Sequence, residues 1–210
     1  MEVKLISYSQ GTWTNCMGVN VPDNRNLLDF VAYTARVSNP SNQDNTDTNE
    51  KLIRYLIKNQ HWSPFEMVSV CLEINTTRDI ARQILRHRSF SFQEFSQRYA
   101  DPTKDLNFTT REARLQDTKN RQNSVEVDDH LLQNEWYRAQ QRVIYAAQRE
   151  YEWAIQNGIA KEQARAVLPE GLIESRIYMN GTLRSWIHYI QLRSANGTQK
   201  EHREIAVACA

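Results

Sequence analysis

Two hydrophobic periods divide the chain into short strands and amphipathic helices. Residues 68–74 alternate apolar and polar side chains, which is the period of a strand with one buried face. Residues 50–59 carry apolar side chains at helical spacing, and Asn49 is the predicted N-cap. The same patterns predict strands at residues 3–8 and 172–179, and helices at residues 27–37, 78 to about 87, 130–156, 161–168, 183–193 and 199–209.

Breaker residues mark the ends of several predicted elements. Pro40 stops the helix at residues 27–37, Gly158 ends the long helix, and Thr77 is placed to cap the helix that follows it. Strict βαβ alternation is missing, which favours an α+β fold in which an antiparallel sheet packs with several helices. One domain over residues 1–210 is expected, with a polar excursion at residues 101–128.

Composition indicates a globular protein without a strong charge field. Apolar residues make up 40% of the chain, charged residues 24%, and the net charge is +1. A nucleic-acid-binding surface built on overall basic charge is therefore not expected, and any anion site must be local. The N-terminus lacks the apolar run of a signal peptide, and no stretch approaches the ~20 apolar residues of a membrane span.

The three cysteines, Cys16, Cys71 and Cys209, are odd in number and far apart. We read them as free thiols in a reducing cytosol, so a cytoplasmic location is expected. The five histidines are scattered, HExxH is missing, and no metal site is predicted. No glycine spacing matches a dinucleotide or phosphate loop, so any nucleotide must be held by side chains, with arginine as the expected residue.

The segment from Arg78 to Arg98 contains five arginines and His87 against two acidic residues. If the helix continued to Arg88, this arginine would lie in the middle of the apolar stripe, where an unpaired guanidinium is costly. Two explanations stay open at this point. Arg88 pairs with an acidic neighbour or lies past the helix end, or it awaits an anionic ligand.

The sequence RHRSFSFQEFSQRY that begins at Arg86 mixes hydrogen-bond donors with aromatic rings. Such a segment suits a phosphate and the edges of a planar ring, although a surface for single-stranded nucleic acid has similar composition. The near-neutral net charge and the lack of other basic stretches argue against the nucleic-acid alternative.

Arg86, His87 and Arg88, followed by seven residues and Ser96, resemble the signature of the flavin-dependent thymidylate synthase (ThyX) family. Further segments are also similar to this family: residues 34–38 (TARVS), 61–66 (HWSPFE), 81–88 (ARQILRHR), 164–169 (ARAVLP) and 183–193 (LRSWIHYIQLR). The resemblance covers nearly the whole chain except the excursion at residues 101–128.

This resemblance implies a ThyX-like catalytic domain that methylates dUMP to dTMP. Reduced FAD would supply a hydride, NADPH would reduce the FAD, and 5,10-methylenetetrahydrofolate would supply the carbon. It also implies a homotetramer whose sites are shared between subunits. The implied FAD-binding residues are His61, Ser63, Arg86, His87, Arg88, Glu94, Thr182, Arg184 and His188. The implied dUMP-binding residues are Gln83, Arg86, Glu94, Phe95, Ser96, Gln97, Arg98, Arg165 and Arg193.

Several of these residues also have ordinary structural explanations. Arg184 and His188 lie on one polar helical face, which is commonly just solvated. His61 follows a predicted helix end, Ser63 suits a turn, and Arg165 is otherwise an unremarkable helix residue. A binding module for RNA or another phosphorylated ligand, and a flavin enzyme with a different nucleotide reaction, are the alternative functions.

The resemblance places Arg193 against the uracil ring as the catalytic residue. A positive charge there would favour the ionised N3 atom and raise electron density at C5, the carbon to be methylated. A cysteine thiolate that adds to C6 is the other known solution. None of the cysteines neighbours the arginine-rich segment in sequence, so catalysis without a cysteine nucleophile is expected, and Ser96 is assigned to binding.

Overall fold

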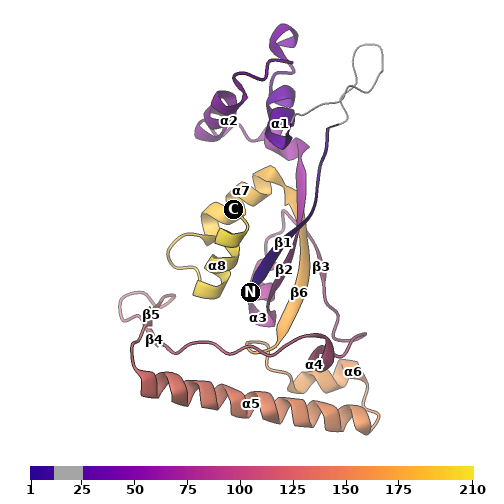
Figure 1. Ribbon diagram of the computed structural model, residues 1–210, viewed down its shortest axis with the longest axis vertical. Coiled ribbons are helices and arrows are strands. Elements are labelled where there is room, and N and C mark those ends of the chain that lie inside the picture. Colours follow the sequence, from indigo (N-terminus) through magenta and orange to yellow (C-terminus); the bar gives the residue numbers. More distant parts are fainter. Residues whose placement is uncertain (12–25) are drawn as a thin grey trace.

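The computed structural model describes residues 1–11 and 26–210, and its centre is an antiparallel sheet with strand order β1–β2–β6–β3 (Figure 1). The strands of this sheet are β1 (Glu2–Tyr8), β2 (Ser69–Thr77), β6 (Glu174–Thr182) and β3 (Ser91–Glu94), and a separate ladder pairs β4 (Arg114–Gln116) with β5 (Ser124–Glu126). The helices are α1 (Leu27–Ala35), α2 (Asn49–Lys58), α3 (Arg78–Ile84), α4 (Pro102–Asp105), α5 (His130–Gln156), α6 (Lys161–Ala164), α7 (Leu183–Arg193) and α8 (Lys200–Ala208), with 3-10 turns η1 (Pro40–Asn42), η2 (Ser63–Met67) and η3 (Arg165–Val167). The predicted α+β class with an antiparallel sheet is confirmed.

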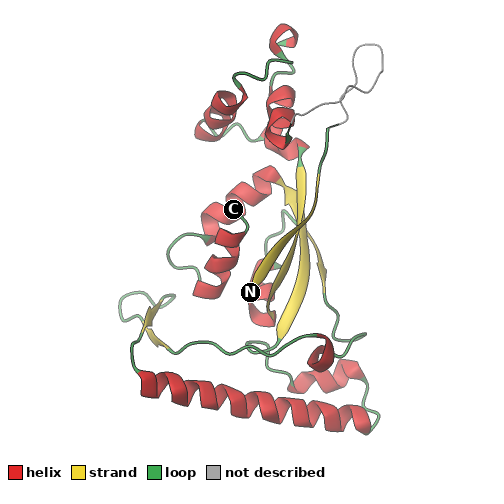
Figure 2. Ribbon diagram, viewed as in Figure 1, coloured by secondary structure: helices red, strands yellow, loops and turns green. Residues whose placement is uncertain are grey.

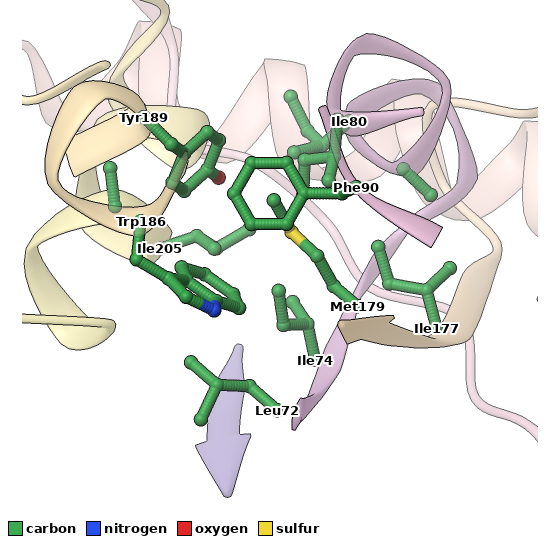
Figure 3. Packing of buried hydrophobic residues seen from close by; sticks show 12 residues of the cluster. Leu72, Ile74, Ile80, Phe90, Ile177, Met179, Trp186, Tyr189 and Ile205 are labelled. Atoms are coloured by element: carbon green, nitrogen blue, oxygen red, sulfur yellow. The ribbon is translucent and has the colours of Figure 1, made fainter. Parts of the chain in front are cut away.

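The long β2–β6 ladder separates an apolar face from a polar one. Leu72 and Ile74 of β2 and Ile177 and Met179 of β6 point to the same side, where they are buried. Helices α3, α7 and α8 cover this side, and Figure 3 shows their side chains meeting those of the strands. Between these apolar residues lie polar ones, such as Glu73, on the opposite face, as the alternation predicted.

Two smaller apolar clusters lie at the two ends of the strands. At one end, α1, α2 and η2 pack together against the first half of α7 (Figures 1 and 2). At the other end, α5 packs against α6 and against the buried Ile173 just before β6. Gly158 has a φ of +78° directly after the end of α5, a conformation that glycine adopts without strain. The predicted helix stop at this glycine is confirmed.

The prediction that Asn49 caps α2 is wrong, because this residue is the first residue of the helix and Thr48 precedes it as N-cap. The Asn49 side chain is buried, accepts a hydrogen bond from Arg36 and donates one of 2.7 Å to Asp29. The Asn49 side chain therefore bonds to residues that are distant in sequence and is not available to cap the helix backbone. Thr77 does occupy the N-cap position of α3, but its hydroxyl donates to Asp79 at 2.7 Å instead of bonding the helix backbone.

Several predicted boundaries also differ from the structure, and three of them have a clear reason. Helix α3 ends at Ile84, three residues before the expected end, because the chain turns there toward β3. The helix expected at residues 161–168 is divided into α6 and η3. Strand β6 reaches Thr182, beyond the expected end at residue 179, because its whole length pairs with β2.

The excursion at residues 101–128 is polar but not irregular throughout. It contains α4 and the β4–β5 ladder, and it runs between the sheet and the long helix α5 (Figure 1). Gln140 of α5 fastens it by donating 2.8 Å to the backbone oxygen of Arg111 and accepting 2.8 Å from its amide. Across residues 1–11 and 26–210, every helix is too short or too polar to traverse a lipid bilayer.

Candidate active site

The turn from Arg86 to Phe90 joins α3 to the edge strand β3. The amide of His87 donates a hydrogen bond of 3.0 Å to the Ile84 oxygen, and the amide of Phe90 donates one of 3.2 Å to the His87 oxygen. The turn exposes Arg86 and Arg88 while His87 is half-buried. Of the explanations that the sequence left open, the structure confirms that Arg88 lies past the helix end, outside the apolar stripe.

Neither Arg86 nor Arg88 forms an ion pair with a carboxylate in the described part of the chain. Arg82, one turn earlier on α3, behaves differently because its guanidinium lies 2.7 Å from a carboxylate oxygen of Glu170. The turn thus presents two guanidinium groups whose charge is not neutralised by a described carboxylate. Such groups are available to an anionic ligand.

Arg193, the last residue of α7, reaches the same turn from the other side. Its Nε atom donates a 2.9 Å hydrogen bond to Nε2 of His87. Burial and the positive charge of Arg193 both lower the pKa of His87. The His87 ring is therefore neutral, and Arg193 keeps its full charge beside it.

Gln83 lies on α3 next to this pair. Its Nε2 atom donates 2.8 Å to Oε1 of Gln199, and its Oε1 atom lies 3.3 Å from Nδ1 of the buried His202. The pKa of His202 falls to about 4, because burial and the charge of Arg193 oppose the imidazolium, as does His87 once low pH protonates it. Gln83, His87 and Arg193 are thus three predicted residues that the fold brings together.

A second group of predicted residues lies where β3 leaves the sheet. Glu94 accepts 2.9 Å from the Ser175 hydroxyl, and the Phe95 amide donates 2.8 Å to the Arg176 oxygen. Ser96 accepts 3.3 Å from the Arg98 amide through its hydroxyl. Two strands therefore define the path of the chain from Glu94 into the following turn.

Arg98 and Arg165 converge on one residue of α6. Arg98 forms a 3.1 Å ion pair with Glu162, and Nε of Arg165 donates 3.2 Å to the backbone oxygen of the same residue. Gln97 precedes Arg98 in the chain with 3% of its surface exposed, and its Nε2 atom has no hydrogen-bond partner in the described structure. This donor is therefore still available to an acceptor.

The third group contains the other residues that the resemblance assigned to flavin. Arg184 pairs with Glu66 of η2, and the His188 ring packs edge-on against Trp62 at a centroid distance of 4.6 Å. The Thr182 hydroxyl accepts 3.3 Å from the Ser185 amide and thereby caps α7. His61 and Ser63 are exposed at the start of this segment.

One chain does not bring all three groups to one place. Thr182 pairs with Ser69 at one end of the β2–β6 ladder, whereas Glu94 pairs with Ile177, and Ser175 lies near the other end. Seven residues of strand separate Thr182 from Ser175, which corresponds to roughly 23 Å at 3.3 Å per residue. The group at Arg184 and the group at Arg98 therefore lie near opposite ends of the sheet.

Sequence reasoning missed several partners of the predicted residues. Gln199 and His202 contact Gln83, Tyr189 contacts His87, and Glu201 contacts Gln199. Glu162 joins the two arginines of the second group. One signal was available for His202, since it shares a helical face with Ile205 and Ala206 of the core. Contacts between distant segments define the others, which no local pattern indicates.

Comparison with known proteins identifies the family. A family model described as thymidylate synthase complementing protein matches residues 23–210. The chain is 52% identical over 179 residues to a protein of Synechocystis sp. named flavin-dependent thymidylate synthase, which covers 85% of this chain and 80% of the relative. The chain belongs to the flavin-dependent thymidylate synthase family. The family and the enzyme class that the Arg86–Arg88 segment predicted are confirmed.

Other relatives of the flavin-dependent thymidylate synthase family agree. A probable flavin-dependent thymidylate synthase of Paramecium bursaria Chlorella virus 1 is 47% identical over 213 residues, covering 100% of this chain and 92% of the relative. Among solved structures, the fold is similar to the crystal structure of a UMP/dUMP methylase, PolB from Streptomyces cacaoi, bound with 5-Br dUMP. That similarity has a TM-score of 0.77 at 26% identity and covers 99% of this chain and 86% of the other.

Proposed function

We propose that this enzyme converts dUMP to dTMP, with 5,10-methylenetetrahydrofolate as carbon donor and NADPH as the reductant of bound FAD. The observation that carries the proposal is the state of three arginines. Arg86 and Arg88 have no carboxylate partner among the described residues, and Arg193 is held by a neutral histidine. Three cations at one turn suit anionic ligands with a planar ring.

The residues present fit FAD. Its diphosphate requires cations that the protein has not already neutralised, and the exposed Arg86 and Arg88 meet this requirement. When bound and reduced, FAD supplies the hydride that completes the methyl group. We propose that the residues holding it are His61, Ser63, Arg86, His87, Arg88, Glu94, Thr182, Arg184 and His188.

The dUMP site is proposed to use the first and second groups. Arg98 pairs with the Glu162 carboxylate and Arg165 donates to the backbone oxygen of the same residue, so a phosphate that displaced this carboxylate would gain the Arg98 guanidinium, and Gln97, whose Nε2 donor is free, precedes Arg98 in the chain. We propose that the residues contacting dUMP are Gln83, Arg86, Glu94, Phe95, Ser96, Gln97, Arg98, Arg165 and Arg193.

Arg193 is the proposed catalytic residue. Its charge next to the uracil ring favours loss of the N3 proton, which raises the electron density at C5. A neutral partner, His87, orients Arg193 without cancelling the charge, whereas a carboxylate would cancel it. The electrostatic effect on the ring is therefore available to the reaction.

The thiols support a route without a cysteine nucleophile. Burial raises the pKa of Cys209 to about 12 and also raises the pKa of Cys71, so neither is poised to form a thiolate. Cys16 lies outside the described residues. A location in the cytosol stays a prediction.

We further propose that residues 1–210 act as one catalytic domain in a homotetramer with shared sites. Two observations support sharing. The group at Arg184 and the group at Arg98 lie near opposite ends of one sheet, so a site that uses both requires two subunits. The outer face of α5 also leaves Leu131, Tyr145 and Trp153 between 56% and 78% exposed, as expected for a helix that packs against another subunit.

The activity is tested by NADPH oxidation that depends on dUMP, together with chromatographic detection of dTMP in the presence of 5,10-methylenetetrahydrofolate. Reactions with UMP in place of dUMP run in parallel. We expect dTMP formation from dUMP. Oxidation of NADPH without any dTMP, or methylation of UMP alone, would contradict the proposal.

Sharing is tested by co-expressing Arg184→Ala and Arg165→Ala chains. Each variant alone is expected to be inactive, but hybrid tetramers contain sites that combine the intact Arg165 of one chain with the intact Arg184 of another. Recovery of about a quarter of the wild-type activity is expected from random mixing on this symmetry argument. Hybrids as inactive as the parent variants would refute shared sites.

A further inference from the structure

A continuous line of hydrogen bonds joins the excursion at residues 101–128 to Gln83. Arg114 of β4 donates to Oε1 of Glu201, and Nε2 of Gln199 donates 2.9 Å to Oε2 of the same carboxylate. Gln83 then donates 2.8 Å from its Nε2 to Oε1 of Gln199. Three elements far apart in sequence, β4, the start of α8 and α3, thus share one network.

The line continues from Gln83 into the core. Nδ1 of His202 lies 3.3 Å from Oε1 of Gln83, and Nε2 of His202 lies 3.2 Å from the Tyr189 hydroxyl. His202 has 0% of its surface exposed, and its pKa of about 4 keeps the ring neutral near neutral pH. Burial also raises the pKa of Tyr189, so its hydroxyl keeps its proton.

Glu201 determines the direction of every bond in this line. Burial opposes its charge, but the hydrogen bonds from Arg114, from its own backbone amide and from Gln199 outweigh burial, and its pKa lies below the usual value. An ionised carboxylate only accepts hydrogen bonds. Gln199 must therefore turn its NH2 group toward Glu201 and its carbonyl oxygen toward Gln83.

The same donor and acceptor rules then fix the orientation of the Gln83 amide and the tautomer of His202. Gln83 must turn its NH2 group toward the carbonyl oxygen of Gln199, which leaves its own oxygen facing His202. His202 must carry its proton on Nδ1 to donate to that oxygen, and its Nε2 accepts from Tyr189. A neutral histidine has two possible tautomers, so this assignment is a testable consequence.

We propose that Glu201 is a positioning residue that acts through Gln199 to orient the amide of Gln83 toward the substrate. The inference rests on the proposed function, in which Gln83 contacts dUMP. One of the two Nε2 hydrogens of Gln83 is used by Gln199, and the second is left for an acceptor on the pyrimidine. A donor at this place suits a uracil ring that has lost its N3 proton, whereas a reversed amide would present an oxygen to a negatively charged ring.

The tautomer is measured directly by NMR of the full-length enzyme with 15N-labelled histidine rings. The chain has five histidines, and a His202→Gln variant assigns the signal of interest. In the wild type we expect His202 to carry its proton on Nδ1. A proton on Nε2 would reverse the line of bonds and overturn the proposal, and this measurement needs neither activity nor a folded variant of Glu201.

The kinetic test uses Glu201→Gln, which keeps the size of the side chain but can donate as well as accept. We expect kcat/KM for dUMP to fall about tenfold, as for loss of a hydrogen bond to a charged group, while bound FAD is retained. The ring signals of His202 should shift toward a mixture of tautomers. Glu204→Gln, an exposed residue on the same helix, makes the same charge change and should leave both readouts at their wild-type values.

Failure of the inference about Glu201 can be distinguished from failure of the proposed function. If the wild type forms no dTMP, the proposed function fails, whereas the His202 tautomer still decides the orientation of Gln83. If dTMP forms and Glu201→Gln keeps both the wild-type tautomer and the wild-type kcat/KM, Glu201 has no positioning role.

Discussion

The Nε atom of Arg193 donates a 2.9 Å hydrogen bond to Nε2 of His87, so two ends of distant segments, α7 and the turn after α3, are joined by a cation and a neutral ring. An arginine paired with a carboxylate has its charge largely cancelled. An arginine oriented by a neutral histidine keeps that charge for a ligand. This pairing distinguishes Arg193 from Arg82 and Arg184, which both contact glutamates.

Flavin retention should depend on the exposed arginines of the turn. We expect Arg88→Ala to weaken FAD binding about tenfold to a hundredfold, because a hydrogen bond to a charged group is lost. Arg82→Ala is the matched control, since Arg82 lies on α3 close to the same turn but is already paired with Glu170 at 2.7 Å. Flavin titration followed by fluorescence measures both. Equal FAD affinity in the two variants would argue against a role of Arg88 in flavin binding.

Removal of the thiols should not stop the chemistry. In a variant with all three cysteines changed to alanine or serine, dTMP formation per folded enzyme should stay within about threefold of the wild type, because no thiolate adds to the substrate. The raised pKa values of Cys71 and Cys209 are the physical reason. Circular dichroism checks the fold. A folded variant with bound flavin and no turnover would restore the thiolate mechanism.

Stability should decline on acidification before the carboxylates titrate. His202 has a pKa of about 4 in the fold against an ordinary value of 6.5, so the unfolded chain takes up its proton first. The stabilising contribution of neutral His202 to the free energy of unfolding is fully present above about pH 6.5 and is lost as the pH falls toward about 4. Its total size is about 3 kcal/mol. Urea unfolding at fixed protein concentration measures it. In His202→Gln the free energy of unfolding should fall less steeply as the pH falls. A difference between wild type and variant that stays constant from neutral pH to pH 4 would contradict the assignment.

Gly181 should be intolerant of any side chain. A Cβ atom on this residue would lie 2.4 Å from Cδ1 of Phe90, and the Phe90 ring packs at 4.8 Å against Trp186 in the core (Figure 3). We expect Gly181→Ala to lower the free energy of unfolding by about 1–3 kcal/mol, as in other overpacked cores. Gly171→Ala, where the nearest atom is 4.0 Å away, is the control and should change it by less than about 0.5 kcal/mol. Equal denaturation midpoints for the two variants would refute the steric argument.

Local periodicity was sufficient for the elements whose burial alternates along the chain. Strand β2 and helix α5 were predicted because one face of each is buried by the rest of the fold. No strand was predicted at β3, since four residues at a sheet edge carry little pattern and their pairing with β6 is non-local. The predicted helix at residues 78 to about 87 ran three residues too far for a related reason, because the turn that follows Ile84 is held partly by Ser185 of α7, which is distant in sequence.

The candidate site likewise contains residues that local sequence identified and residues that it did not. Arg86, His87, Arg88 and Arg98 were found from one continuous segment, and family resemblance assigned their roles. Gln199, Glu201 and His202 were not found, since Gln83 and Gln199 are 116 residues apart and meet only through packing of α3 against α8. Three-dimensional contacts therefore supply the residues that orient the side chains which sequence alone identifies.

The most direct measurement of the central claim is the turnover of Arg193→Ala with saturating dUMP, NADPH and 5,10-methylenetetrahydrofolate. Loss of one preorganised charge at a reacting centre reduces kcat by about 10²–10³. We expect a loss of this size in dTMP formation while the flavin absorbance of the purified variant is unchanged, and Arg54→Ala on α2, an exposed arginine paired with Glu50, should have wild-type turnover. Wild-type dTMP formation by Arg193→Ala would contradict activation of the uracil by this arginine.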